Sequence, residues 1–158
     1  MARFISRLVR DYKEDTLTVI FNVKEIHLTS NTGSSTLEGI VLEWNRGDTS
    51  EKSPKLGNME ISGPIKKLNC DHSFMKNSVF YRKNAAGPPQ YLEKKAILRV
   101  FASFSIPPIA GAKYPMNLGE AALDLRTFIG KNAETASFPL TIAGVHMGQV
   151  SCQITILP

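Results

Sequence analysis

The sequence has few of the features that mark secreted or membrane-spanning proteins. It contains only two cysteines, Cys70 and Cys152, whereas a small disulfide-stapled domain would carry more of them at a higher density. No Asn-x-Ser/Thr acceptor for N-glycosylation occurs. The N-terminus has no apolar run long enough for a signal peptide or a transmembrane helix. These absences favour two reduced thiols in a cytoplasmic protein.

Motifs for catalysis or metal binding are also missing. There is no Gly-x-Ser-x-Gly elbow, no phosphate-binding Walker loop and no Gly-x-Gly-x-x-Gly turn. The three histidines and two cysteines lack the paired spacing of a zinc site, and Cys70-Asp-His72 is their only close pair. We therefore expect no enzyme activity, no metal and no cofactor.

The overall composition indicates one globular domain with a basic surface. A chain of 158 residues with 42% apolar and 21% charged residues can bury a substantial core. The net charge of +5 favours anionic partners such as lipid headgroups or nucleic acid. We expect no nucleic-acid partner, because the aromatic residues fall mostly at core positions and do not alternate with the lysines as a stacking surface would.

Most of the chain has the period-two alternation of β-strands. Leu17, Val19, Phe21 and Val23 alternate with Thr16, Thr18, Ile20 and Asn22. Trp44 is in phase with the apolar residues just before it, which places it in the core. Turn-rich or polar breaks are predicted at 29–36, 45–54 and 84–90. We predict an all-β fold, an eight-stranded antiparallel β-sandwich, with strands at 16–23, 40–44, 56–61, 65–68, 73–82, 95–104, 118–125 and 148–157.

Residues 1–14 have a different pattern, which predicts a short basic amphipathic helix ahead of a domain at 15–158. The apolar residues at helical spacing are Phe4, Ile5, Leu8, Val9 and Tyr12. The arginines on the opposite face are Arg3, Arg7 and Arg10. The apolar stripe would pack on the sandwich or lie on a membrane surface.

The order of elements in the C-terminal sixty residues resembles the second half of a C2 domain. A strand at 96–105 is followed by a Pro-rich loop at 106–116, a strand at 118–125, a one-turn segment at 126–130 and a final alternating strand at 148–157. The chain looks most like the N-terminal-type (NT-type) C2 domains that begin longer cytoplasmic proteins. The resemblance implies a β-sandwich that docks on membranes.

Calcium-binding C2 domains supply aspartates from two loops at one end of the sandwich. Here the corresponding loops, 29–36 and 106–116, contain no acidic residue. Ala102, Ser103 and Ser105 stand where the family pattern would place aspartates. The sequence therefore predicts a module that works without calcium.

The resemblance also implies two lipid-contacting regions. A concave basic face, which often binds phosphoinositides in C2 domains, would use Lys66, Lys67, Arg82, Lys83, Lys94 and Lys95. The membrane-touching loop would present Ile106, Ile109, Tyr114 and Met116. The basic residues could instead form an ordinary solvated surface among nearby acids, and the apolar loop could fold back under the sandwich.

Two functions follow from these observations. The first is a calcium-independent, peripheral-membrane module that docks a larger cytoplasmic protein onto anionic phospholipids. The second is a C2-like domain that binds a trafficking or cytoskeletal protein and has no affinity for lipid. Sedimentation with liposomes would separate them.

Overall fold

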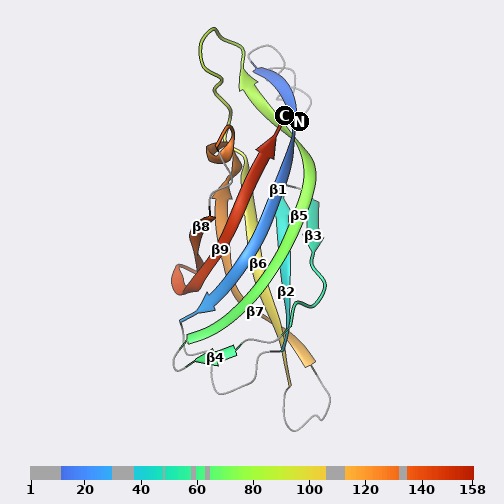
Figure 1. Cartoon of the computed structure of the whole chain (residues 1–158), viewed down its shortest axis with the longest axis vertical. Coiled ribbons are helices and arrows are strands. Elements are labelled where there is room, and N and C mark those ends of the chain that lie inside the picture. Colours follow the sequence, from blue (N-terminus) through green and yellow to red (C-terminus); the bar gives the residue numbers. More distant parts are fainter. Residues whose placement is uncertain are drawn as a thin grey trace.

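Antiparallel β-strands form most of the computed structural model (Figure 1). The structure describes residues 12–29, 38–47, 49–57, 60–62, 65–105, 113–131 and 135–158. The strands are β1 (Tyr12–Leu28), β2 (Glu38–Arg46), β3 (Thr49–Lys52), β4 (Glu60–Ser62), β5 (Ile65–Lys83), β6 (Lys95–Ser105), β7 (Lys113–Asp124), β8 (Thr135–Ile142) and β9 (Val145–Leu157). A 3-10 turn, η1 (Leu125–Phe128), follows β7 where a one-turn segment was predicted. The predicted all-β antiparallel fold is confirmed.

The strands form two packed layers. Neighbouring strands follow the order β3-β2-β6-β7-β8-β9-β1-β5-β4. The ladder between β7 and β8 has a single residue pair, Glu120 opposite Thr141, so the sheet is nearly divided there. Figure 1 shows β9, β1 and β5 in front of β2, β6 and β7. The two groups of strands therefore form the layers of a sandwich, with the core between them.

Aromatic rings join the two layers at the centre of the core. Trp44 of β2 is 3% exposed, which confirms its predicted burial. Its ring centroid lies 5.0 Å from that of Phe21 in β1 and 5.6 Å from that of Phe74 in β5. Such tilted and edge-on pairs stabilise a core beyond the area that they bury.

A β-bulge explains why β1 is longer than the predicted strand. Buried positions are odd-numbered from Leu17 to Val23 and even-numbered at Ile26 and Leu28. The register with both β5 and β9 shifts between Val23 and Glu25, so one extra residue is accommodated there. The strand can therefore continue past the bulge with its apolar side chains still facing the core.

Several predicted strand boundaries were wrong, and the described residues form nine strands where eight were expected. The segments predicted at 65–68 and 73–82 are one strand, β5, of 19 residues. The loop predicted at 45–54 contains β3, and the strand predicted at 56–61 is reduced to β4. β8 was missed because Pro139 interrupts its pattern. Proline is tolerated there because β8 has only one pairing with β7, so few hydrogen bonds are needed on that side.

The N-terminal prediction needs one correction. Tyr12 was placed on the apolar face of a helix, but Tyr12 to Glu14 belong to β1 and pair with the end of β5. The remainder of the predicted helix, residues 1–11, lies outside the described residues.

Burial makes both cysteines poor nucleophiles in the folded protein. Burial raises the pKa of Cys70 from 9.0 to about 11 and that of Cys152 from 9.0 to about 12. Because the thiolate is the reactive form, we expect iodoacetamide at pH 8 to leave Cys152 unmodified and to modify Cys70 slowly. Intact-mass spectrometry would follow the reaction. Both thiols should react rapidly once the protein is unfolded in guanidinium, and equal rates for folded and unfolded protein would contradict the burial.

The same shifts affect stability at high pH. The unfolded thiols ionise near their ordinary pKa of 9.0, whereas the folded thiols ionise at higher pH. Their contribution to stability is therefore fully present below pH 9 and is lost as the pH rises through the folded values.

Candidate functional site

The six basic residues predicted to form one face lie in three separate places. Lys66 and Lys67 pair with the end of β1, opposite Leu28 and His27, whereas Lys83 pairs with Tyr12 at its beginning. At about 3.3 Å per residue, the 16 positions from Lys67 to Lys83 extend over ~50 Å. The side chain of Lys66 lies outside the described residues. One binding face could not include both ends of β5.

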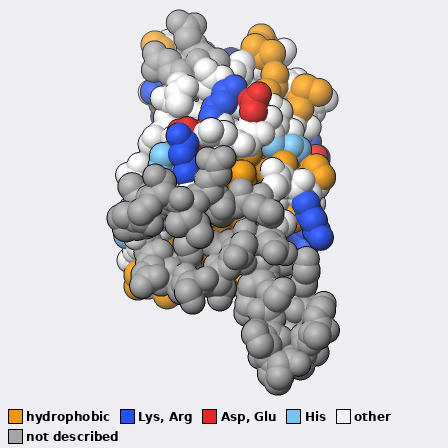
Figure 2. Space-filling model, turned by 60° about the horizontal axis from the view of Figure 1, so that its bottom comes forward, with side chains coloured by type: hydrophobic (Ala, Val, Ile, Leu, Met, Phe, Trp, Pro, Cys, Tyr) orange, Lys and Arg blue, Asp and Glu red, His pale blue; other side chains and the backbone are white. Residues whose placement is uncertain are grey.

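Carboxylates neutralise three of these charges. The Nζ of Lys67 lies 3.0 Å from an oxygen of Glu25, and the hydrogen bond from Lys67 is the main cause of the lowered pKa of that carboxyl. The Nε of Arg82 donates to Asp15 at 2.8 Å. Lys95 lies 3.9 Å from Glu93. Figure 2 likewise shows single Lys and Arg side chains beside acidic and His side chains on the lower end of the molecule, without a continuous basic patch over the described part.

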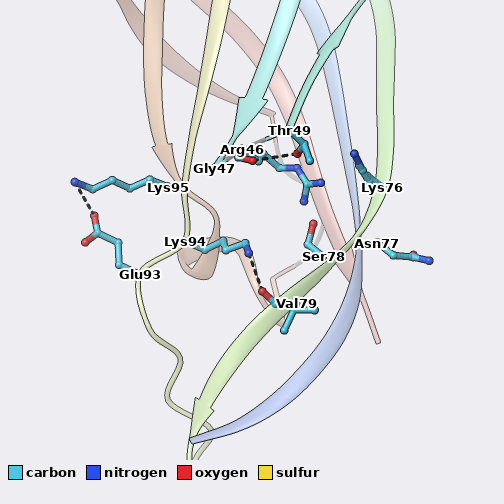
Figure 3. Close-up of a pocket in the computed structure, with 10 residues that line it drawn as sticks. All are labelled: Arg46, Gly47, Thr49, Lys76, Asn77, Ser78, Val79, Glu93, Lys94 and Lys95. Atoms are coloured by element: carbon cyan, nitrogen blue, oxygen red, sulfur yellow. Dashed lines mark hydrogen bonds and ion pairs between the residues drawn. The ribbon is translucent and has the colours of Figure 1, made fainter. Parts of the chain in front are cut away.

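Lys94 lies in a different environment, at a cleft between the two layers. The cleft has a volume of about 730 Å³. Its lining comes from the end of the β2–β3 hairpin, the middle of β5 and the loop before β6, and includes Arg46, Lys76, Ser78, Lys94 and Lys95. Figure 3 shows the Arg46 guanidinium, the Ser78 hydroxyl and the Lys94 ammonium directed into this space, with Asn77 pointing away. We call this site the Arg46–Lys94 cleft.

The two cations that name the cleft are partly buried and held in place. The Nζ of Lys94 donates to the carbonyl oxygen of Val79 at 2.8 Å and lies 5.8 Å from the centre of the Phe80 ring. Burial, and then repulsion from Arg46, lower the pKa of Lys94. Burial also lowers the pKa of Arg46, whose guanidinium carbon lies 5.4 Å from the centre of the Trp44 ring. Burial disfavours both charges, and repulsion from Arg46 further disfavours that of Lys94, whereas Glu51 attracts Arg46. An anion between the two cations would offset the cost of burial.

Ser78 contributes a buried polar group to the same cleft. The residue is 4% exposed, and its hydroxyl has no hydrogen-bond partner among the described residues. It has the same orientation along β5 as the buried rings of Phe74 and Phe80. A buried hydroxyl without a partner destabilises the folded state, and a ligand oxygen could satisfy it.

Sequence reasoning missed Arg46, Lys76 and Ser78, although a signal was present. Arg46 continues the core phase of Ile40, Leu42 and Trp44, and Lys76 lies between the core positions Phe74 and Ser78. A charged residue at a position where the alternation predicts a buried side chain indicates that the core opens there. Arg46 and Lys76 both have this property, which could have located the cleft.

The other predicted contact residues are only partly described. Met116 lies in β7 opposite Ala102 and is partly buried against the core, so it does not form part of an exposed loop tip. Tyr114 is also in β7, but its side chain is outside the described residues, as are Ile106 and Ile109. The N-terminal residues Arg3, Phe4, Ile5, Arg7, Leu8 and Arg10 are outside them too.

The described part of the chain contains no group of three or more His, Cys, Asp or Glu residues placed to hold a metal ion. No helix within it is long and apolar enough to cross a bilayer.

Solved structures that superimpose on this chain include C2 domains. The C2A domain of plant extended synaptotagmin 1 superimposes with a TM-score of 0.56 at 10% identity, covering 89% of this chain and 94% of that one. A C2 domain-containing protein from an elicitor-responsive gene gives a TM-score of 0.55 at 10% identity, with 94% and 92% covered. CC2D1B, which coordinates ESCRT-III activity during the mitotic reformation of the nuclear envelope, gives a TM-score of 0.53 at 9% identity. The match covers 97% of this chain and 67% of that one.

These likenesses establish the fold alone, because the identities are low. The chain has a C2-like β-sandwich. No family model matches the sequence. No curated protein matches it either.

Proposed function

We propose that this protein is a calcium-independent binding module that docks a larger cytoplasmic protein onto an anionic membrane. The observation that carries the proposal is the convergence of Arg46 and Lys94 on one cleft, with Lys76 at its wall. The one carboxylate among the lining residues, Glu93, is directed toward Lys95 and away from the other three cations (Figure 3). The cleft therefore has a positive field that an anionic headgroup would neutralise.

The chemistry of the cleft favours a phosphorylated headgroup over a lone carboxylate. A guanidinium can donate two parallel hydrogen bonds to phosphate oxygens, and an ammonium supplies a compact second charge. The Ser78 hydroxyl could donate a further hydrogen bond from the floor of the cleft. A volume of about 730 Å³ is within the range of sites for small molecules.

The position of the cleft suggests which other segments would touch the membrane. β1 begins beside the end of β5, a few residues beyond the cleft, so the arginine-rich residues 1–11 precede a strand that starts at this end. β6 begins at Lys95 and ends ten residues later at Ser105, about 33 Å away at strand spacing. The loop with Ile106 and Ile109 therefore leaves the opposite end of β6. We propose that the N-terminal segment, and not this loop, acts together with the cleft.

Lys94→Gln should weaken binding to vesicles of phosphatidylcholine that contain a phosphoinositide by about tenfold, because it removes a charge-assisted hydrogen bond donor from a partly buried site. Sedimentation in the presence of a calcium chelator is the measurement. We expect wild-type binding to be the same in chelator and in calcium. Binding should fall at high salt, because the screening length shortens from ~8 Å at physiological ionic strength to ~3 Å at 1 M.

Lys95→Gln is the matched control, because it changes the net charge by the same amount at the neighbouring position. Lys95 borders the cleft, but its exposed ammonium points out of it toward Glu93 (Figure 3). The binding of this variant should stay close to that of the wild type. Equal losses in the two variants would contradict a role for the cleft. A wild-type protein that sediments only in calcium, or equally with neutral vesicles, would refute the proposed function.

A further inference from the structure

The outer face of the β9–β1–β5 layer has no charged residue over its central part. Among residues 16–22 of β1, 73–79 of β5 and 149–155 of β9, every side chain in the outward phase is Ser, Thr, Asn, Gln, Ile, Met or Val. In the outward phase, charged residues occur only beyond these limits, for example in the Lys24–Asp71 and Lys67–Glu25 ion pairs and at Glu14 and Lys83 at the other end. Figure 1 shows this face toward the viewer, with no described segment crossing it. In a chain with 21% charged residues, such a stretch is unusual.

The centre of this face is apolar. Ile20 of β1 is opposite Met75 of β5, and Thr155 of β9 lies on its other side. Met75 is 67% exposed. Leu157, two residues along β9 from Thr155, is 45% exposed. These are two of the three large hydrophobic residues that are most exposed in the described part of the chain. An exposed apolar cluster of this kind on a folded domain marks an interaction surface.

The polar residues on both sides of this centre hydrogen-bond to one another. The Thr18 hydroxyl donates to the side-chain oxygen of Asn77 at 2.8 Å. On the other side of Ile20, the Asn22 amide donates to the Ser73 hydroxyl at 2.6 Å. The face therefore has an apolar middle and an uncharged polar rim with fixed side chains, which is the usual anatomy of a protein–protein interface.

We infer that this uncharged face pairs with the same face of a second copy of the chain. The net charge of +5 makes two copies repel each other wherever charged surfaces meet. A face without charge is the place where identical basic chains can approach without like charges opposed, and a two-fold pair uses the same patch on both partners. An acidic partner would instead be drawn to the cationic regions, because this face provides no electrostatic steering.

The size of the face sets the expected strength of the pair. Seven residues along the strands and three strands across give roughly 23 by 14 Å, or about 330 Å² before side-chain relief is counted. A standard stable interface buries about 800 Å² on each partner. The dimer should therefore be weak and in rapid exchange with the monomer. This inference does not depend on the proposed membrane function.

Sedimentation velocity of the whole chain at increasing concentration tests the inference. The wild-type protein should shift from monomer toward dimer. Met75→Lys should remain monomeric over the same range, because it places two like charges at the centre of the interface. Its melting temperature should be unchanged, since Met75 is on the surface.

Val145→Lys is the matched control, because Val145 is also a strongly exposed apolar residue, at 61%, and the charge change is the same. It lies at the start of β9, away from the central part of the face. It should dimerise like the wild type. A wild-type protein that stays monomeric at the highest concentration, or equal behaviour of the two variants, would overturn the inference and leave the face to a different partner.

Discussion

Trp44→Ala is expected to lower the free energy of unfolding by about 3–5 kcal/mol, because it leaves a large cavity between the two layers. Trp44 is the one tryptophan of the chain and packs against Phe21 from β1 and Phe74 from β5. Alanine would remove both ring contacts and the surface on which the Arg46 guanidinium lies. Urea denaturation followed by far-ultraviolet circular dichroism would measure the change, since the variant has no tryptophan fluorescence.

Trp44→Phe separates packing from polar effects. The indole nitrogen of Trp44 is buried without a hydrogen-bond partner among the described residues, so phenylalanine removes no hydrogen bond observed there. The Phe variant should lose much less stability than the Ala variant. An exposed-surface change, Met75→Ala, should stay within about 0.5 kcal/mol of the wild type. A Trp44→Ala protein as stable as Met75→Ala would show that Trp44 is not a core residue.

Gly148→Ala is the second change with a large expected effect, a loss of about 3 kcal/mol. Gly148 of β9 pairs with Leu28 at the end of β1 in the antiparallel ladder of these two strands. A β-carbon at Gly148 would overlap the carbonyl oxygen of His27 and lie 2.9 Å from the α-carbon of Leu28. Both contacts are with backbone, so no side-chain rotation can relieve them and the two strands would have to separate.

Gly144→Ala, in the turn between β8 and β9, distinguishes this overlap from ordinary glycine strain. A β-carbon at Gly144 meets nothing within 4 Å, but the residue has a φ of +81°. Alanine there should lose only about 1–2 kcal/mol. Thermal unfolding of both variants is the measurement, and a Gly148→Ala protein no less stable than Gly144→Ala would contradict the close approach of β1 and β9.

The basic residues show where sequence reasoning was insufficient. Lys66-Lys67 and Arg82-Lys83 were assigned to one face because each pair is near a predicted strand. That assignment treated the chain between them as separate short strands. In the structure, β5 is continuous and carries the two pairs to opposite ends of the molecule. Lys94 and Lys95 are neighbours in the chain, yet one turns into the cleft and the other pairs with Glu93 at the surface.

Local alternation by itself determined much of this protein. The period of two in Leu17–Val23, in the residues before Trp44 and in the last strand required half-buried strands, and so an all-β sandwich with Trp44 inside. These are short-range properties, since adjacent side chains of a strand point to opposite faces. The tertiary structure decided the rest, because it depends on which strands meet. The pairing of the strands accommodates the bulge after Val23 and tolerates Pro139 in β8. The packing of the two layers brings Arg46, Ser78 and Lys94 together from two strands and a loop. No local pattern encodes such a meeting, since the register and the packing of the two layers place these residues at one site.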